Sequence, residues 1–398
     1  MRVSTNLINM RAVNGMLDQQ SKLSELQMQL SSGKRIQSPA DDPIGSAKSL
    51  NIDQSISVTK QFQRNSDIVK TRLQLEDSIL NNVSLVLNRV RELALQGNNS
   101  STTDNDRSLL ADELKQRLDE VLSLANTRDS NGEYIYSGFQ VKNQPFSKAA
   151  GGGFGYAGDD GQRMIQVGPS RSVAFGNTGR DVFLDIKNGN GNFSVADSSG
   201  NTGTAVIDGG TLANGATWVQ DTYTITFTSD TTFEVRDSGG SLVLSDTYTD
   251  GSNISFNGVN TNIKGQPASG DIFTISPSSV QDVFTTIQNL VDAFGKTTTG
   301  PGSAAKLHNS VNSVLNDIDQ AMENILGVRS SVGVRLNTLD SQTNINETKI
   351  INDNANLATI RDIDYIKAVS DLNLQQVGLE SAQKAYMQIQ GLTLFNYL

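Results

Sequence analysis

The C-terminal stretch from Tyr365 to Leu398 constrains this chain more than any other segment, because it carries an apolar strip that a lone helix cannot bury. Tyrosine or leucine recurs there every seven residues, with alanine or isoleucine three positions after members of that set. The strip comprises Tyr365, Ala368, Leu372, Leu379, Ala382, Tyr386 and Ile389. This spacing is typical of a coiled coil, so the sequence predicts a partner helix from this chain or from a neighbouring copy.

The predicted partner is the opposite end of the chain. A seam of the same period is formed there by Met16, Leu23, Leu26 and Leu30. We expect a first helix from about Ser4 to Ser32, followed by Gly33, because glycine readily adopts the left-handed conformation that closes helices. We interpret the pairing of the two ends as a subunit interface, with assembly as the function. Its predicted C-terminal residues are Leu372, Leu379, Tyr386 and Ile389.

Charge and composition exclude several classes of protein. The formal net charge of −10 argues against a nucleic-acid surface. The absence of Cys excludes disulfides and thiolate metal sites, and a single His excludes two-His metal motifs. The chain lacks a run of eighteen apolar residues, and its first twenty lack the apolar centre of a signal peptide. From composition alone we expect no cofactor, no membrane span and a cytoplasmic location.

Prolines and aromatic residues mark two helical flanks. No Pro occurs in 44–144 or 302–398, and Phe62 is the only aromatic residue before Glu133. Because Pro breaks helices, such stretches favour long ones. Apolar seams predict a helical hairpin over 44–96 and about 104–124, two further helices at 280–294 and 307–325, and a polar helical stretch over 332–363.

The middle of the chain has a different pattern. Short alternating runs between Gly, Asn and Asp predict strands, most clearly at Tyr223–Phe227 and Thr232–Val235. Their spacing favours a β-sandwich or barrel inserted into the helical rod, with its entry and exit close together. The predicted fold class is therefore a multidomain α+β chain with a long coiled-coil or bundle rod built from both termini.

Three parts are expected. Residues 1–42 and 365–398 form the terminal coiled coil, which we expect to be disordered in the monomer. Residues 43–140 and 280–364 form the helical rod, and residues 141–279 form the β domain.

Candidate catalytic groups have simpler interpretations. His308 follows a seam residue and is expected to be a solvated helix residue. The adjacent acids Asp41–Asp42 and Asp159–Asp160 lie in Pro-rich and Gly-rich loops, where acids cap helices or close turns. Gly153, Gly155 and Gly158 match a dinucleotide fingerprint without the strand and helix that it needs, so we predict a loop. No catalytic, cofactor or metal residue is predicted.

Several motifs point to one family. The run Leu30–Pro43, which contains Gly33, Arg35, Pro39, Asp41 and Asp42, resembles the N-terminal signature of bacterial flagellins. Arg89–Gln96 resembles the flagellin helix that follows. Gly132–Phe139, Tyr156–Arg163 and Gly179–Phe183 are more similar to the hook–filament junction branch of the flagellin superfamily, as is Pro43. The resemblance covers residues 1–183 and 280–398.

This resemblance implies a function. It implies a structural subunit of the bacterial flagellum that forms a ring between hook and filament through its terminal helices. The implied partners are other copies of the chain, a hook-associated protein on the hook side, flagellin on the filament side and a cytoplasmic export chaperone, with no nucleic acid and no membrane. Export through the flagellar type III channel needs no cleavable signal, so the resemblance replaces the cytoplasmic expectation with an extracellular one.

Two alternatives remain open at this point. Within the superfamily, the chain is alternatively a filament flagellin. In another class, the β domain carries a surface adhesin or an enzyme, for which Trp218 and several Tyr are the available groups, although they suit a core equally well.

Overall fold

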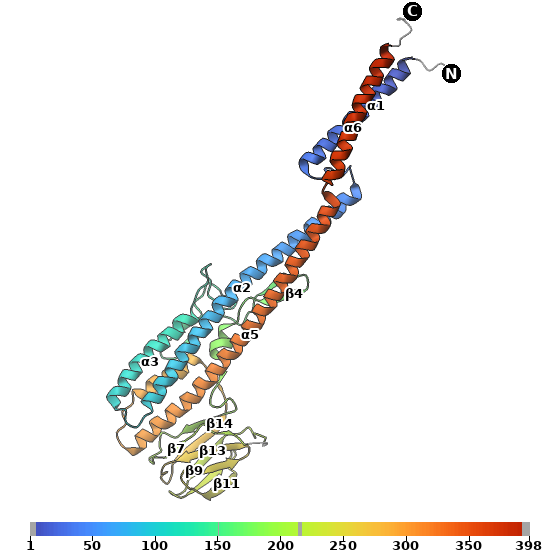
Figure 1. Ribbon diagram of the computed structural model, residues 1–398. Coiled ribbons are helices and arrows are strands. Elements are labelled where there is room, and N and C mark those ends of the chain that lie inside the picture. Colours follow the sequence, from blue (N-terminus) through green and yellow to red (C-terminus); the bar gives the residue numbers. More distant parts are fainter. Residues whose placement is uncertain (1–4, 150, 214–216, 392–398) are drawn as a thin grey trace, which may run out of the picture. The chain divides into compact units, whose positions relative to one another are not determined.

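The computed structural model describes residues 5–149, 151–213 and 217–391 (Figure 1). Its contacts divide the chain into two compact units, Met1–Arg64 with Ser341–Leu398 and Asn65–Asp340. Two long helices, α2 (Pro43–Gly97) and α5 (Pro301–Arg361), contribute to both units. We refer to these units as unit 1 and unit 2.

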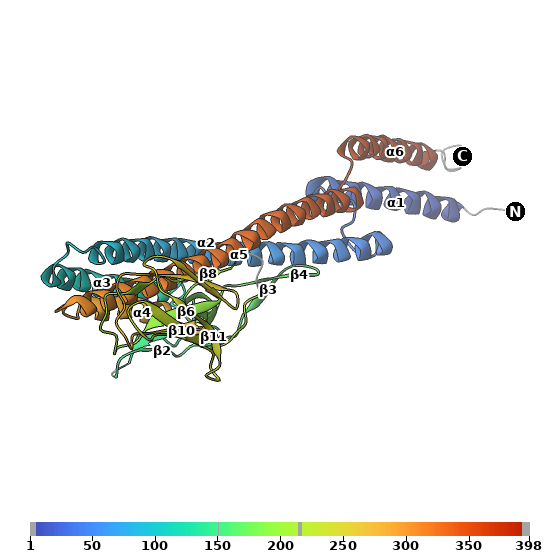
Figure 2. The ribbon, with the colours of Figure 1, turned by 90° about the horizontal axis from the view of Figure 1, so that it is seen from below.

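Unit 1 contains the two ends of the chain. Helices α1 (Thr5–Ser32) and α6 (Tyr365–Gly391) lie side by side and antiparallel, as Figures 1 and 2 show. The predicted pairing of the two terminal helices is therefore confirmed. The first part of α2 pairs with the last part of α5, where Ser55 Oγ donates a 3.0 Å hydrogen bond to Asp353 and Arg361 lies 3.6 Å from Asp53.

Unit 2 contains a helical bundle of α2, α3 (Asp104–Ala125), α4 (Val283–Phe294) and α5. The predicted hairpin is confirmed, and α3 begins with a capping box in which Thr103 and Asp106 satisfy each other's backbone amides. One expected seam residue is misplaced: Val280 is exposed in a short strand, because Asp282 caps α4 by accepting from the amide of Thr285. The polar helical stretch predicted over 332–363 is the last part of α5, which runs without a break to Arg361.

One apolar core fills the helical bundle of unit 2. It joins the inner faces of α2 to α5 with an aromatic cluster from the segment between α3 and α4 and from the first turn of α4. The cluster comprises Tyr136, Phe146, Phe154, Tyr156, Phe183 and Phe284, with ring centroids 5.1–5.8 Å apart. The motif Gly132–Phe139 is held on α2 by Arg72, which donates to the carbonyls of Tyr134 and Ile135 and pairs with Asp129 at 2.5 Å.

Short strands follow α3. They are β1 (Phe146–Lys148), β2 (Phe154–Tyr156), β3 (Met164–Gly168) and β4 (Arg171–Ala174), and a π-helical turn at Arg180–Leu184 comes next. The entry strand β5 (Ile186–Lys187) pairs antiparallel with the exit strand β15 (Val280–Gln281), which confirms that the chain enters and leaves the β domain at one place.

The β domain between them is an antiparallel sandwich. One sheet has the order β11-β10-β9-β14-β6 and the other β12-β13-β7, with β8 also paired to β13. The bounds are β6 (Phe193–Asp197), β7 (Val206–Ile207), β8 (Thr211–Leu212), β9 (Tyr223–Phe227), β10 (Thr232–Arg236), β11 (Leu242–Thr247), β12 (Asn253–Phe256), β13 (Val259–Lys264) and β14 (Ile272–Pro277).

The sandwich has its own core. Alternate residues such as Ile225 and Ile275 from one sheet pack with Ile263 from the other. Trp218 packs on Phe193 and Tyr223 at 5.2 and 5.8 Å, so it is part of this core. The predicted fold class, a helical rod with an inserted β-sandwich, is confirmed.

Candidate assembly surface at the chain termini

The predicted interface residues lie along the contact between α1 and α6. Met16, Leu23, Leu26 and Leu30 of α1 are half-buried, as are Leu372, Leu379 and Tyr386 of α6, and Ala368 is buried. The two helices approach closely at Gly378, where an added Cβ would lie 3.0 Å from Gln19 Nε2. Ile389 lies within the bounds of α6, but its side chain is outside the described residues.

Tyr365 does not belong to the seam, contrary to the seven-residue spacing. It is 56% exposed, and its hydroxyl lies 2.8 Å from the position that a Cβ on Gly33 would occupy. The reason is that α6 begins at Tyr365, so its first side chain meets the connecting segment rather than α1.

A second set of apolar side chains on the same two helices is exposed. It comprises Leu7, Met10, Val13, Leu17 and Met28 on α1 and Ile366, Val369, Leu374, Val377 and Met387 on α6. A pair of helices has only one mutual seam, so these side chains lie outside it. Rows of exposed apolar side chains of this kind are typical of a site of protein interaction.

The signature residues after α1 form a structured turn. Gly33 has a φ of +71°, and its amide bonds to Gln29 O at 2.8 Å, so it closes α1 as predicted. Pro39 lies exposed in the turn that follows. Asp42 caps α2 by accepting from the amide of Gly45 at 2.8 Å, and this bond lowers the pKa of its carboxyl group.

Asp41 takes the other role expected of these acids, because it closes a turn rather than capping α2. Its carboxylate accepts from the backbone amides of Ser38 and Gln37 at 2.8 and 2.9 Å and so closes the turn before the helix. These bonds, the one from Ser38 first, lower the pKa of Asp41. The position of Asp41 three and four residues after its donors, ahead of the helix start, explains the difference.

The other candidate groups have structural partners. Asp159 accepts from the amides of Phe139 and Gly161, and Asp160 pairs with Arg180 at 2.8 Å. The Gly153–Gly158 run forms the turn and second strand of the β1–β2 hairpin and the loop after it. No described helix is long and apolar enough to span a membrane, and the described ranges contain no cluster of three metal-ligating side chains.

His308 is half-buried rather than solvated. Its Nδ1 lies 2.6 Å from Asn98 Oδ1 at the end of α2. Burial, with the nearby charge of Arg107, lowers the pKa of the imidazole. The expectation of a solvated residue was wrong because the C-terminal end of α2 covers this face of α5.

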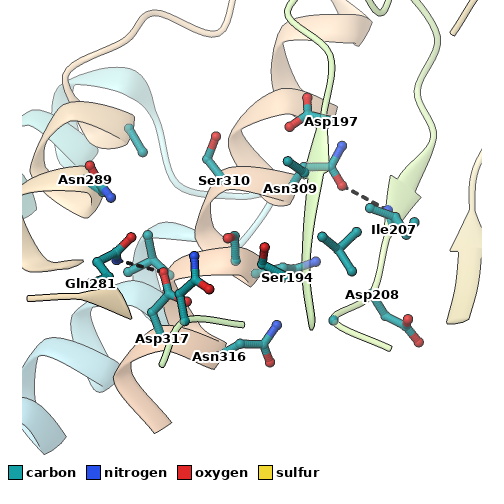
Figure 3. Close-up of a pocket in the computed structure, with 18 of the residues that line it drawn as sticks. Ser194, Asp197, Ile207, Asp208, Gln281, Asn289, Asn309, Ser310, Asn316 and Asp317 are labelled. Carbon is teal, nitrogen blue, oxygen red and sulfur yellow. Dashed lines mark hydrogen bonds between the residues drawn. The ribbon is translucent and has the colours of Figure 1, made fainter. Parts of the chain in front are cut away.

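A polar cleft of about 390 Å³ lies where α4 and α5 face β6 and β7 (Figure 3). Asp317 accepts from the Gly189 amide and from Gln281, and Asn309 accepts from the Ile207 amide at 2.9 Å. Burial raises the pKa values of Asp197 and Asp317. These bonds attach the β-sandwich to α5, so the polar groups have a packing role.

Sequence reasoning missed a buried charged site on α2. Glu76 is fully buried, and its Oε1 accepts from the backbone and side-chain amides of Asn177 at 3.1 and 2.8 Å. Arg335 of α5 donates to the other end of the Asn177 side chain at 2.8 Å. Burial raises the pKa of Glu76 to about 7. The available signal was a carboxylate three positions before the seam residue Ile79.

Comparisons with known proteins agree with this architecture. Residues 3–141 match the family described as bacterial flagellin N-terminal helical region, and residues 315–398 match the bacterial flagellin C-terminal helical region. The chain is 24% identical to flagellar hook-associated protein 3 of Escherichia coli K12, over 99% of both chains. Phase 1 flagellin of Salmonella naestved is 29% identical, but the match covers 46% of this chain and 31% of that protein.

A solved structure carries the comparison further. The flagellar hook-associated protein-3 of Legionella pneumophila is 35% identical and superposes with a TM-score of 0.75, covering 78% of this chain and 98% of that one. This similarity extends over nearly the whole length of the Legionella protein. It therefore agrees with the helical flanks, the inserted sandwich and the signature turn described above. The chain belongs to the family of flagellar hook-associated protein 3.

Proposed function

We propose that this chain is a structural subunit of the bacterial flagellum that forms the junction between hook and filament. Copies assemble into a ring through their terminal helices, with a hook-associated protein on one side and flagellin on the other. The observation that carries the proposal is the exposed apolar set on α1 and α6, which the α1–α6 seam leaves outside. Further copies of similar helices offer complementary apolar rows to it.

The proposed subunit works without catalysis. The groups first considered for chemistry serve as caps, turns and ion pairs, as Asp42, Asp159 and Asp160 illustrate. The subunit is exported to the outside of the cell, with a cytoplasmic chaperone as its partner before export. We expect the amides of α1 and α6 to exchange faster with solvent in the monomer than in the assembled ring, because each apolar row needs a neighbour to become dry.

The filament flagellin reading is weaker. The flagellin match is confined to under half of this chain, whereas the junction-protein relatives match it nearly end to end. A filament polymerised from the purified chain alone would favour that alternative.

The test is a deletion strain complemented with the full chain or with a chain lacking 365–398. We expect electron microscopy of the deletion strain to show hooks without filaments and flagellin in the medium. The full chain restores filaments and the truncated chain does not. Attached filaments in the uncomplemented deletion strain would contradict the proposal.

A further inference from the structure

Two short connectors in unit 1, far apart in the sequence, are paired by backbone bonds. The N-connector (Gly33–Asp42) joins α1 to α2, and the C-connector (Asp362–Asp364) joins α5 to α6. The Arg35 amide donates to Arg361 O at 2.7 Å, and the Ile363 amide donates to Gly33 O at 3.0 Å. These bonds flank an antiparallel bridge between Lys34 and Asp362, so the four helix ends are tied together at one place.

The Arg35 side chain adds further bonds where the two connectors meet. Its Nη2 donates to Ile360 O, in the last turn of α5, at 2.8 Å and lies 3.4 Å from Asp42 Oδ2. Carbonyls in the last turn of a helix lack helical donors and carry negative partial charge, so a guanidinium is a favourable partner. The other oxygen of Asp42 caps α2. One side chain therefore links the end of α5 to the start of α2.

The start of α6 is fixed at the same point. Asp364 caps α6 by accepting from the amides of Ile366 and Lys367, both at 3.1 Å. The phenol of Tyr365 lies over Gly33, where any larger side chain would meet it. The positive φ of Gly33 and the absence of a Cβ are thus both used by the joint.

We propose that the two connectors form one joint in which Arg35 is the positioning residue, holding α1 and α6 as a pair in a fixed register. The pair then presents its exposed apolar rows to a second copy of the chain as one surface. This inference rests on the assembly part of the proposed function. Its physical basis is preorganisation, because independent connectors would require the ordering of two helices at each docking event.

The test is amide hydrogen exchange on the full-length monomer, comparing Arg35→Ala with Lys34→Ala. Lys34 is the matched control: it carries the same charge one position away, and its side chain makes no hydrogen bond or ion pair within the described residues. The readout is the Ile363 amide, whose sequence neighbours are unchanged. We expect its exchange to be about tenfold faster in Arg35→Ala and unaltered in Lys34→Ala.

Amides of α3 and α4 should be unaffected in both variants, which confirms that unit 2 stays folded. Equal Ile363 exchange rates in the two variants, or a wild-type Ile363 amide that exchanges as in an unstructured peptide, would overturn the joint.

The same variants are then expressed in the deletion strain, where Arg35→Ala should attach at least severalfold fewer filaments than Lys34→Ala. Equal attachment despite faster exchange would overturn the positioning role. The exchange result does not depend on that strain, so a failure of the proposed function is distinguishable.

Discussion

Helix α2 has buried positions at the same alternating spacing in both compact units, but the side chains at those positions differ. In unit 1 they are small, polar or aliphatic, namely Gly45, Ser49, Ile56 and Thr59. In unit 2 they become predominantly large and apolar, namely Val69, Leu73, Leu80, Val83, Leu87, Val90 and Ala94. The partner helix α5 changes in the same direction, from Val311, Val314 and Ile318 in unit 2 to Gln342, Asn346 and Leu357 in unit 1.

The difference separates two properties of a helical seam. The spacing decides which helix faces meet, whereas the side chains decide how much free energy the meeting releases. A buried leucine contributes about 2 kcal/mol through the hydrophobic effect, and a buried serine contributes far less. We therefore expect unit 2 to be the stable body and unit 1 to open more readily. Gln342 and Asn346, one turn apart on α5, are hydrogen-bonded to each other at 2.9 Å, and burying such amides contributes less to stability than burying leucines.

The largest expected effect is a core truncation in unit 2. Leu87→Ala should lower the free energy of unfolding by about 2–5 kcal/mol, because Leu87 is 0% exposed and the change leaves a cavity. Leu85→Ala on the same helix is the control, since Leu85 is exposed, and should cost less than about 0.5 kcal/mol. Urea unfolding followed by circular dichroism measures both.

Ser49→Ala makes the same test in unit 1. We expect a change below about 1 kcal/mol, because the buried Ser49 hydroxyl has no hydrogen-bond partner in the described part of the chain. A loss as large as that of Leu87→Ala would show that the two seams are energetically alike.

The next effect concerns the buried charge of unit 2. The pKa of Glu76 is raised from 4.5 to about 7 in the folded chain, so the fold prefers the protonated carboxyl group. Its contribution to stability is present below pH 4.5 and is lost as the pH rises through about 7. Glu76→Gln should therefore stabilise unit 2 by about 2–3 kcal/mol at pH 8 and change little at pH 4.

Urea unfolding of the wild-type chain and Glu76→Gln across pH 4–8 measures this difference. Asp317 also has a raised pKa, but it is present in both the wild-type protein and Glu76→Gln. The difference in pH dependence between the two proteins therefore reports the titration of Glu76. A variant with the wild-type pH dependence would contradict the assignment.

A smaller effect is expected from making the unit 1 seam apolar. Gln342→Leu combined with Asn346→Leu should stabilise the pairing of α2 and α5 in unit 1 by about 1–2 kcal/mol, because apolar side chains replace two buried amides. Slower amide exchange in 341–361, with unchanged exchange in α3, is the expected result. Faster exchange there would mean that the polar pair contributes more than apolar packing.

The smallest effect is expected from removing a partly exposed side chain of unit 1, Lys349, which bonds to Ser55 and Asp353. Lys349 Nζ donates to Ser55 Oγ and to Asp353, both at 2.8 Å. Lys349→Ala should cost about 0.2–1 kcal/mol, and the loss should shrink in high salt. Lys60→Ala, at an exposed position on α2, supplies the control. If the loss of unfolding free energy in Lys349→Ala did not depend on salt, the side chain would stabilise unit 1 through packing and not through its charge.

Sequence reasoning succeeded where the signal is local. The α1–α6 pairing follows from heptads, and strands such as Tyr223–Phe227 follow from alternation between turn residues. It failed where a residue's partner lies far along the chain. Arg35 bonds to a carbonyl 325 residues away, Glu76 to Asn177 at a separation of 101, and His308 to Asn98 at 210. The prediction for Tyr365 was wrong for a related reason. Its heptad position lies opposite the N-connector and not opposite α1.

The amino-acid sequence by itself determined the helical flanks, the β insertion, the closing role of Gly33 and the apolar rows that a single helix leaves uncovered, because spacing and backbone preference act over a few residues. Only the tertiary structure decided that Asp41 closes a turn while Asp42 caps a helix, that the two connectors pair, and that a carboxyl group lies buried on α2. Those outcomes depend on which distant groups come within hydrogen-bond distance, and that is set by packing rather than by local pattern.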